Sequence, residues 1–118
     1  MTHSALLANG RVVCPELSVA DTAPSRMKGL LGRRSLGEGE GLLLRPAASI
    51  HTAFMRFPID AVFLDAEMQV LRVETNLRPW RVAAQRGAKA VVELPAGAAE
   101  NMGLAVGLTL SLAEDRLT

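Results

Sequence analysis

An apolar stretch in the middle of the chain, residues 49–65, constrains the fold more than any other part of the sequence. It holds all three phenylalanines of the protein, and Pro58 divides it in two. A segment this apolar is typical of strands buried on both faces, where an ionisable group must be paired or lie at an opening. Three such groups, His51, Arg56 and Asp60, lie inside it. The stretch is therefore the best candidate both for the core and for a functional site.

Turn-forming residues divide the rest of the chain into short segments. Asn9-Gly10 is the strongest signal for a two-residue hairpin turn, and we expect Pro15 to end that pairing. A polar connection at residues 66–69 predicts a second hairpin, whereas residues 76–87 show no periodicity and predict a long irregular loop. The expected strands are residues 5–8, 11–14, 17–20, 42–45, 50–57, 59–65, 70–75, 90–94 and 108–112.

Two short helices are expected among these strands. The first spans residues 23–32, begins after a cap at Asp21 or Thr22, and ends at Gly32. The second spans residues 96–102. Because helices do not alternate regularly with strands, the pattern argues against a doubly wound parallel sheet. The predicted fold class is mainly β: a compact antiparallel β-sandwich or jelly-roll-like barrel with two short helices. Residues 1–118 are expected to form a single domain.

Composition and charge restrict the partners, metal sites and location that we expect for this chain. A net charge of +1, from 13 basic and 12 acidic residues, gives no reason to expect a nucleic-acid partner. Two histidines and one cysteine do not make the ligand set of a structural zinc site, so we expect no metal and no cofactor. The lone Cys14 is interpreted as a small core residue. The sequence shows neither a secretory signal nor 18 consecutive apolar residues, which predicts no membrane association and a cytoplasmic location.

The ionisable groups of the central stretch have two interpretations each. In an alternating central strand over residues 50–57, His51 either satisfies its ring nitrogens in the core or faces a cleft, and the first is favoured. Arg56 and Asp60 flank the corner at Pro58 and can pair across it. Such an ion pair would mainly fix the geometry of this corner.

Two further positions can carry a site. Trp80, beside Arg81 in the long loop, can stack on a ligand, although we favour an indole folded onto the sandwich as a plug. Glu93, in an otherwise apolar strand, is either a buried carboxylate or a solvent-facing position, and the second is the commoner case.

Four segments of the chain together resemble a known family. They are Ala-Asp-Thr with Arg-Met-Lys-Gly-Leu-Leu-Gly-Arg (20–33), Gly-Leu-Leu-Leu (41–44), the stretch 51–65 and Val-Glu-Leu-Pro-Ala-Gly (92–97). In this order they are similar to the domain of unknown function 192 family of small bacterial and archaeal proteins, over about residues 16–112. A further segment, Leu-Arg-Pro-Trp-Arg (77–81), resembles the subgroup with a Pro-Trp-Arg loop. The resemblance implies a compact, mostly β fold and no reaction. The family pattern is recognisable at Arg26, His51, Met55, Arg56, Asp60, Trp80, Glu93 and Gly97.

The first hypothesis is a non-enzymatic domain that binds a small polar or anionic ligand or a protein partner. The ligand-binding candidates are His51, Arg56, Asp60, Trp80, Arg81 and Glu93. One alternative is a hydrolase in which His51 is the general base and Asp60 or Glu93 orients it. Another is a structural or assembly module, which would expose an apolar patch. We expect a monomer or a weak homo-oligomer.

Overall fold

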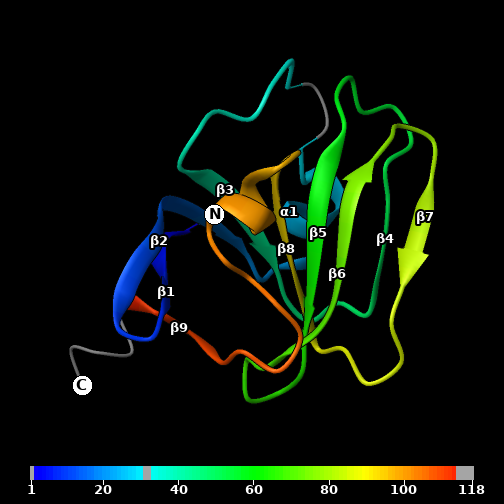
Figure 1. The fold of residues 1–118 in the computed structure, drawn as a ribbon. Coiled ribbons are helices and arrows are strands. Elements are labelled where there is room, and N and C mark those ends of the chain that lie inside the picture. Colours follow the sequence, from blue (N-terminus) through cyan, green and yellow to red (C-terminus); the bar gives the residue numbers. More distant parts are fainter. Residues whose placement is uncertain (1, 31–32, 114–118) are drawn as a thin grey trace.

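The computed structural model describes residues 2–30 and 33–113, which form a strongly curled β-sheet with two short helices (Figure 1). The main sheet contains seven of the described strands, and the other two form a separate ribbon. The main-sheet strands are β1 (Thr2–Ala8), β2 (Arg11–Ala20), β3 (Glu40–Leu44), β5 (Ile59–Leu64), β6 (Val70–Leu77), β8 (Ala90–Pro95) and β9 (Leu110–Leu112). The ribbon consists of β4 (Ser49–His51) and β7 (Val82–Ala84). The predicted mainly β fold class is confirmed.

One pair of neighbouring strands departs from the antiparallel pattern. The order in the main sheet is β6-β5-β8-β3-β2-β1-β9, and β2 and β3 are parallel, whereas the other paired strands are antiparallel. Parallel neighbours cannot be joined by a tight turn and need a crossover. The crossover here contains α1 (Ala23–Lys28), which is thereby placed over one face of the sheet.

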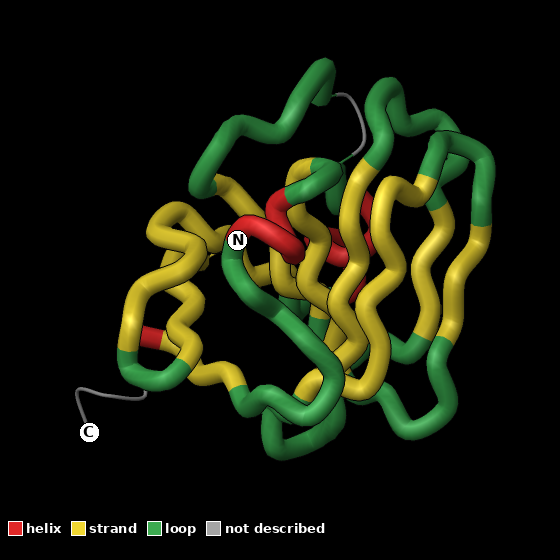
Figure 2. The backbone as a smooth tube through the Cα atoms, in the orientation of Figure 1, coloured by secondary structure: helices red, strands yellow, loops and turns green. Residues whose placement is uncertain are grey.

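The chain from Gly107 into the first residue of β9 joins the two ends of the curled sheet. The amide of Gly107 donates to the carbonyl of Val70 at 2.8 Å, and the amide of Leu110 donates to the carbonyl of Met68 at 2.9 Å. The same segment then pairs with β1 through β9. It therefore runs from the β6 edge to the β1 edge, and it closes the sheet on itself (Figure 2).

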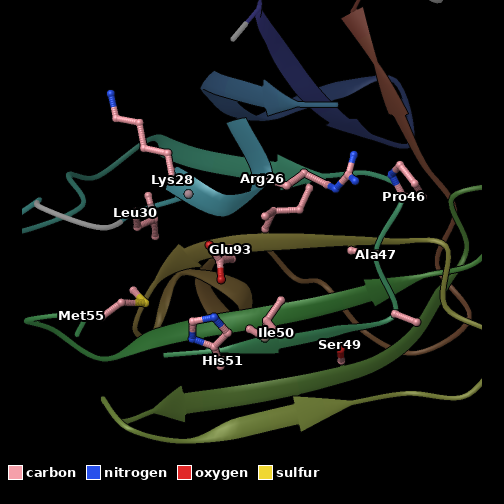
Figure 3. Close-up of a pocket in the computed structure, with 13 residues that line it drawn as sticks. Arg26, Lys28, Leu30, Pro46, Ala47, Ser49, Ile50, His51, Met55 and Glu93 are labelled. Carbon is pink, nitrogen blue, oxygen red and sulfur yellow. The ribbon is translucent and has the colours of Figure 1, made fainter. Parts of the chain in front are cut away.

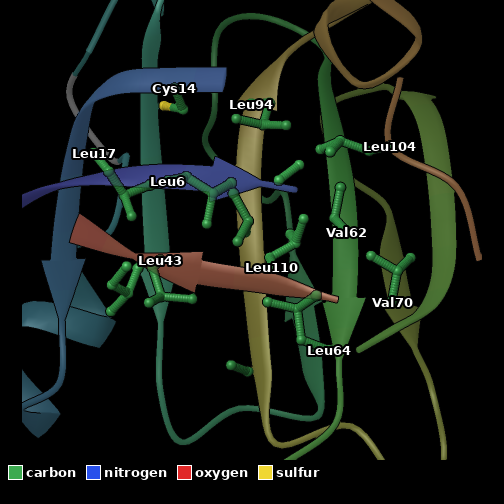
Figure 4. Packing of buried hydrophobic residues seen from close by; sticks show 14 of the residues in the cluster. Leu6, Cys14, Leu17, Leu43, Val62, Leu64, Val70, Leu94, Leu104 and Leu110 are labelled. Atoms are coloured by element: carbon green, nitrogen blue, oxygen red, sulfur yellow. The ribbon is translucent and has the colours of Figure 1, made fainter. Parts of the chain in front are cut away.

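The sheet separates two apolar layers. In the inner layer, β1 and β9 cross over β3, β8 and β5, and Leu6, Val62 and Leu110 are among the side chains that meet between them (Figure 4). The outer layer contains Phe63, the next residue along β5, and is covered in part by Leu30 just after α1. Successive residues of a strand point to opposite faces, so β5 and β8 supply side chains to both layers.

The two helices begin differently: the first has a capping box, whereas the N-cap residue of the second supplies no side-chain hydrogen bond. The hydroxyl of Thr22 accepts a hydrogen bond from the amide of Ser25, and the hydroxyl of Ser25 accepts one from the amide of Thr22, which makes a capping box at the start of α1. The helix ends at Gly29, with φ 45°, earlier than predicted; Gly32 lies outside the described residues. The second helix, α2 (Ala98–Asn101), follows Gly97. Among the described helices, none is both long enough and apolar enough to cross a membrane.

Three local predictions were wrong. The expected strand over residues 50–57 ends at His51, because the next residues form a turn held by hydrogen bonds to residues 78–81. The loop expected over residues 76–87 contains β7, which pairs with β4. Pro15 does not end the first hairpin, because register shifts in the pairing with β1 let β2 continue past it.

Candidate functional site

A cavity of about 320 Å³ opens on the outer face of the sheet, beside the end of α1 (Figure 3). Its walls come from three parts of the chain that are far apart in the sequence: the end of α1, the segment from β3 to the turn after β4, and the middle of β8. The lining residues are Arg26, Lys28, Gly29, Leu30, Leu44, Pro46, Ala47, Ala48, Ser49, Ile50, His51, Met55 and Glu93.

Glu93 is the buried acid of this cavity. Strand β8 lies between β3 and β5, and its register places Glu93 between Leu42 and Ala61. Only 4% of the residue is exposed. Because burial disfavours the charged form, the pKa of Glu93 rises from its ordinary 4.5 to about 7. The solvent-facing interpretation of Glu93 is therefore wrong, and the alternative of a buried carboxylate is confirmed.

The Glu93 carboxylate has no hydrogen-bond partner among the residues that the structure describes. Glu93 lines the cavity, and its carboxylate points toward the wall that carries His51 (Figure 3). A buried polar group without a partner costs about 1–3 kcal/mol. A water molecule or a ligand that donates to Glu93 in the cavity would remove this cost.

His51 stands at the mouth of the same cavity. It is the last residue of β4, pairs with Val82 of β7, and has an exposed side chain. The imidazole and the Glu93 carboxylate lie on facing walls (Figure 3). The interpretation of His51 as a core histidine is wrong, and the alternative of a histidine that faces a cleft is the one observed.

The cations of the cavity come from the last turn of α1. Arg26 is partly buried, Lys28 is exposed, and neither forms an ion pair with an acid in residues 2–30 or 33–113. The Arg26 guanidinium extends toward Pro46, away from Glu93 (Figure 3). The cavity therefore has an acidic end at Glu93 and a cationic end at Arg26.

Sequence reasoning missed these two cations as site residues. Arg26 had been recognised only as a position of the family pattern, and a basic residue near the end of a helix is equally explained by the helix dipole. What brings Arg26 to Glu93's cavity is the crossover between β2 and β3. The spacing of Arg26 and Glu93 in the sequence does not indicate that the two residues line one cavity.

Asp60 lies on the opposite face of the sheet. Its Oδ1 accepts a hydrogen bond from the amide of Asn76 at 2.9 Å, and its Oδ2 accepts from the amides of Gly97 and Ala99 at 3.0 Å each. The residue is fully buried and satisfies the first amides of α2. Its role is to hold α2 against β5 and β6.

Two predictions for Asp60 therefore fail. The expected pair with Arg56 is wrong, because Arg56 is exposed and the described residues contain no ion pair between them. The arrangement in which Asp60 orients His51 is also wrong, since Asp60 bonds to α2 on the inner side whereas His51 borders the outer cavity.

Trp80 and Arg81 lie away from the cavity. Trp80 is 61% exposed, so the interpretation as a plug is wrong. Its ring meets that of Phe54, itself 71% exposed, edge to face with centroids 4.6 Å apart. Arg81 lines a second and more open hollow of about 420 Å³ with Arg78 beside the end of β6.

A buried threonine positions this aromatic pair. The Thr52 hydroxyl donates to the carbonyl of Arg78 at 2.6 Å and accepts from the amide of Arg81 at 2.8 Å. The Thr52 carbonyl also accepts from the amide of Trp80 at 3.0 Å. The turn that carries Phe54 is thereby tied to the loop that carries Trp80. The only sequence signal for this role is a hydroxyl inside the apolar stretch.

Comparison with solved structures supports the fold. A crystal structure from Sinorhizobium meliloti 1021, described as a "putative transcription regulator", matches 94% of this chain and 92% of its own with a TM-score of 0.81 at 22% identity. A protein of unknown function from Novosphingobium aromaticivorans matches 93% of this chain and 84% of its own with a TM-score of 0.76 at 21% identity. At such identities the likeness shows the fold alone.

Sequence comparison identifies the family. A UPF0127 protein of Pyrococcus furiosus is 35% identical over 86% of this chain and 90% of its own length. A UPF0127 protein of Thermococcus sibiricus is 32% identical over 83% of this chain, which spans 66% of that relative. The model of the DUF192 family, described as "Uncharacterized ACR", matches residues 5–112. The chain therefore belongs to the DUF192 family.

Proposed function

We propose that the protein binds a small polar or anionic molecule in the cavity between α1, β4 and β8. The observation that carries the proposal is Glu93, whose buried carboxylate lines a cavity and has no protein partner in the described structure. A buried carboxylate lowers the stability of the fold unless a hydrogen-bond donor satisfies it. Ligand sites typically combine apolar walls with a few polar groups that point into the cavity. Arg26 and Lys28, which pair with no acid among the described residues, supply positive charge on the same cavity.

The first test is a thermal-shift screen with small carboxylates, phosphates and neutral polar molecules at millimolar concentration. A ligand at 100 times its Kd adds about 2.7 kcal/mol to the free energy of unfolding. We expect hits to stabilise the wild type and to lose most of that effect in Glu93→Gln and Arg26→Gln. Glu67→Gln and Arg86→Gln, two exposed positions outside the cavity, are the matched controls. Hits that stabilise all five proteins equally, or a screen without hits, would contradict the proposal.

A second candidate function rests on His51 and Glu93 together. A carboxyl whose pKa lies near 7 is poised to exchange a proton at neutral pH, and an imidazole borders the same cavity. This arrangement favours proton transfer, as in the hydrolase hypothesis in which His51 is the general base and Glu93 orients it. Hydrolysis of p-nitrophenyl acetate above the buffer rate, lost in both His51→Ala and Glu93→Gln, supports it. An unchanged rate in the two variants refutes it.

The location and assembly of the protein stay predictions. We infer a cytoplasmic location and a monomer or weak homo-oligomer. Cell fractionation with immunoblotting checks the first, and light scattering over a range of concentrations checks the second. A mass that remains dimeric or larger at the lowest concentration would overturn the second.

A further inference from the structure

The cavity places opposite charges at separate ends, and this arrangement restricts its ligand more than the proposed function does. Glu93 enters from β8, next to Met55 and Leu30, whereas the Arg26 guanidinium lies toward Pro46 (Figure 3). The inference that follows rests on the proposed function, since it names the chemical class of ligand for the same cavity.

The acidic end calls for a donor, and best for a cation. A carboxylate at 4% exposure is poorly hydrated, and no described cation pairs with it. An ammonium group placed there restores the ionised form and forms charge-assisted hydrogen bonds, which are the strong ones. The imidazole ring of His51 lies on the facing wall and has a nitrogen that can serve as one further acceptor. A ligand anion would instead be repelled by ionised Glu93.

The other end calls for an anion. Arg26 is partly buried and is not paired within the described chain, and a guanidinium binds a carboxylate through two parallel hydrogen bonds. A purely cationic ligand would meet repulsion from Arg26 at this end.

We infer that the cavity takes a small zwitterion of the amino-acid class, with its ammonium group at Glu93 and its carboxylate at Arg26. The size agrees, because about 320 Å³ lies at the lower end of the range for small-molecule pockets. Among the described residues, the charged or titratable groups that line the cavity are Arg26 and Lys28 from α1, His51 from β4 and Glu93 from β8. One acid between three basic groups suits a ligand that carries both signs.

The test compares three forms of the same molecule. Each standard L-amino acid is titrated into the full chain by calorimetry beside its N-acetyl derivative, which keeps only the anion, and its amide, which keeps only the cation. For at least one amino acid we expect the zwitterion to bind at least tenfold more tightly than either derivative. Glu93→Gln should reduce that preference over the N-acetyl form, and Arg26→Gln should reduce it over the amide. Glu67→Gln and Arg86→Gln should keep both preferences.

Proton release gives a second readout. Near neutral pH an ammonium at Glu93 displaces a proton, so titrations in phosphate and in Tris should report net proton release. The release should persist in Glu67→Gln and vanish in Glu93→Gln. If the N-acetyl derivatives bind as tightly as the amino acids, or if binding takes up protons, the zwitterion assignment fails while the proposed function stands. If amino acids, derivatives and the wider screen all fail to bind, both fail.

Discussion

At the scale of single residues, the structure separates two buried carboxylates that look alike in the sequence. Asp60 and Glu93 each lie in an apolar strand, and both are buried. Asp60 accepts three backbone hydrogen bonds, whereas Glu93 accepts none from the described residues. The first is thus a structural group and the second is available to a ligand.

Glu93 makes stability depend on pH in a defined direction. Its pKa is about 7 in the folded protein against an ordinary 4.5, so the folded state binds the proton more tightly than the unfolded state. Glu93 therefore makes its full contribution to the free energy of unfolding below about pH 4.5, and this contribution is lost as pH rises to about 7. This linkage corresponds to about 3 kcal/mol.

Glu93→Gln removes that dependence. We expect the unfolding free energy of the variant, relative to wild type, to rise by about 3 kcal/mol between pH 4.5 and pH 7.5. Urea unfolding at several pH values measures it, and Glu67→Gln controls for exposed carboxyls. A difference that stays constant with pH would show that Glu93 is not the group described here.

Thr52 is expected to be sensitive to loss of its hydroxyl. Thr52→Val keeps the shape but leaves the carbonyl of Arg78 and the amide of Arg81 without this partner. The expected loss is about 1–3 kcal/mol, with Thr52→Ser less affected. Urea unfolding gives the free energy, and the emission of Trp80 reports whether the aromatic pair moves. Equal stability of the Val and Ser variants would contradict the assigned role.

At the scale of elements, the predictions that succeeded were local. The Asn9-Gly10 hairpin and the hairpin of β5 and β6 were correct because a turn and an apolar pattern determine each of them. The capped start of α1 was correct for the same reason. The turn after His51 was missed, because its hydrogen bonds come from residues 78–81, far along the chain. The sequence did not predict that the lining residues of the cavity lie together, because only the parallel crossover brings α1 to β8.

Helix α2 depends on a carboxylate from another element. Asp60→Asn replaces one acceptor oxygen by an NH₂ group that faces buried amides, so we expect a loss of at least about 1–3 kcal/mol in unfolding free energy. Asp65→Asn is the matched control, because Asp65 also accepts two backbone amides but lies in a partly exposed turn. Urea unfolding should show a smaller loss for the control. Comparable losses would argue against the capping role.

At the scale of the whole molecule, the closure of the sheet makes the last strand a core element. Leu110 is 2% exposed and belongs to the segment that bonds to Met68 and Val70. We expect Leu110→Ala to cost about 2–5 kcal/mol. Val106→Ala, at 68% exposure just before the closing segment, should change stability by less than about 0.5 kcal/mol. Thermal and urea unfolding measure the stability of both variants. A small effect of Leu110→Ala would mean that the closing strand β9 does not unfold together with the rest of the sheet.

The position of β8 in the sheet has a consequence for synthesis on the ribosome. It is hydrogen-bonded between β3 and β5, both of which precede it in the chain, and it carries Glu93. A nascent chain that has released α1, β3 and β5 therefore lacks the acidic end of the cavity until the β8 segment has left the exit tunnel and entered the middle of the sheet. The proposed ligand therefore cannot meet Glu93 before β8 is in place between β3 and β5.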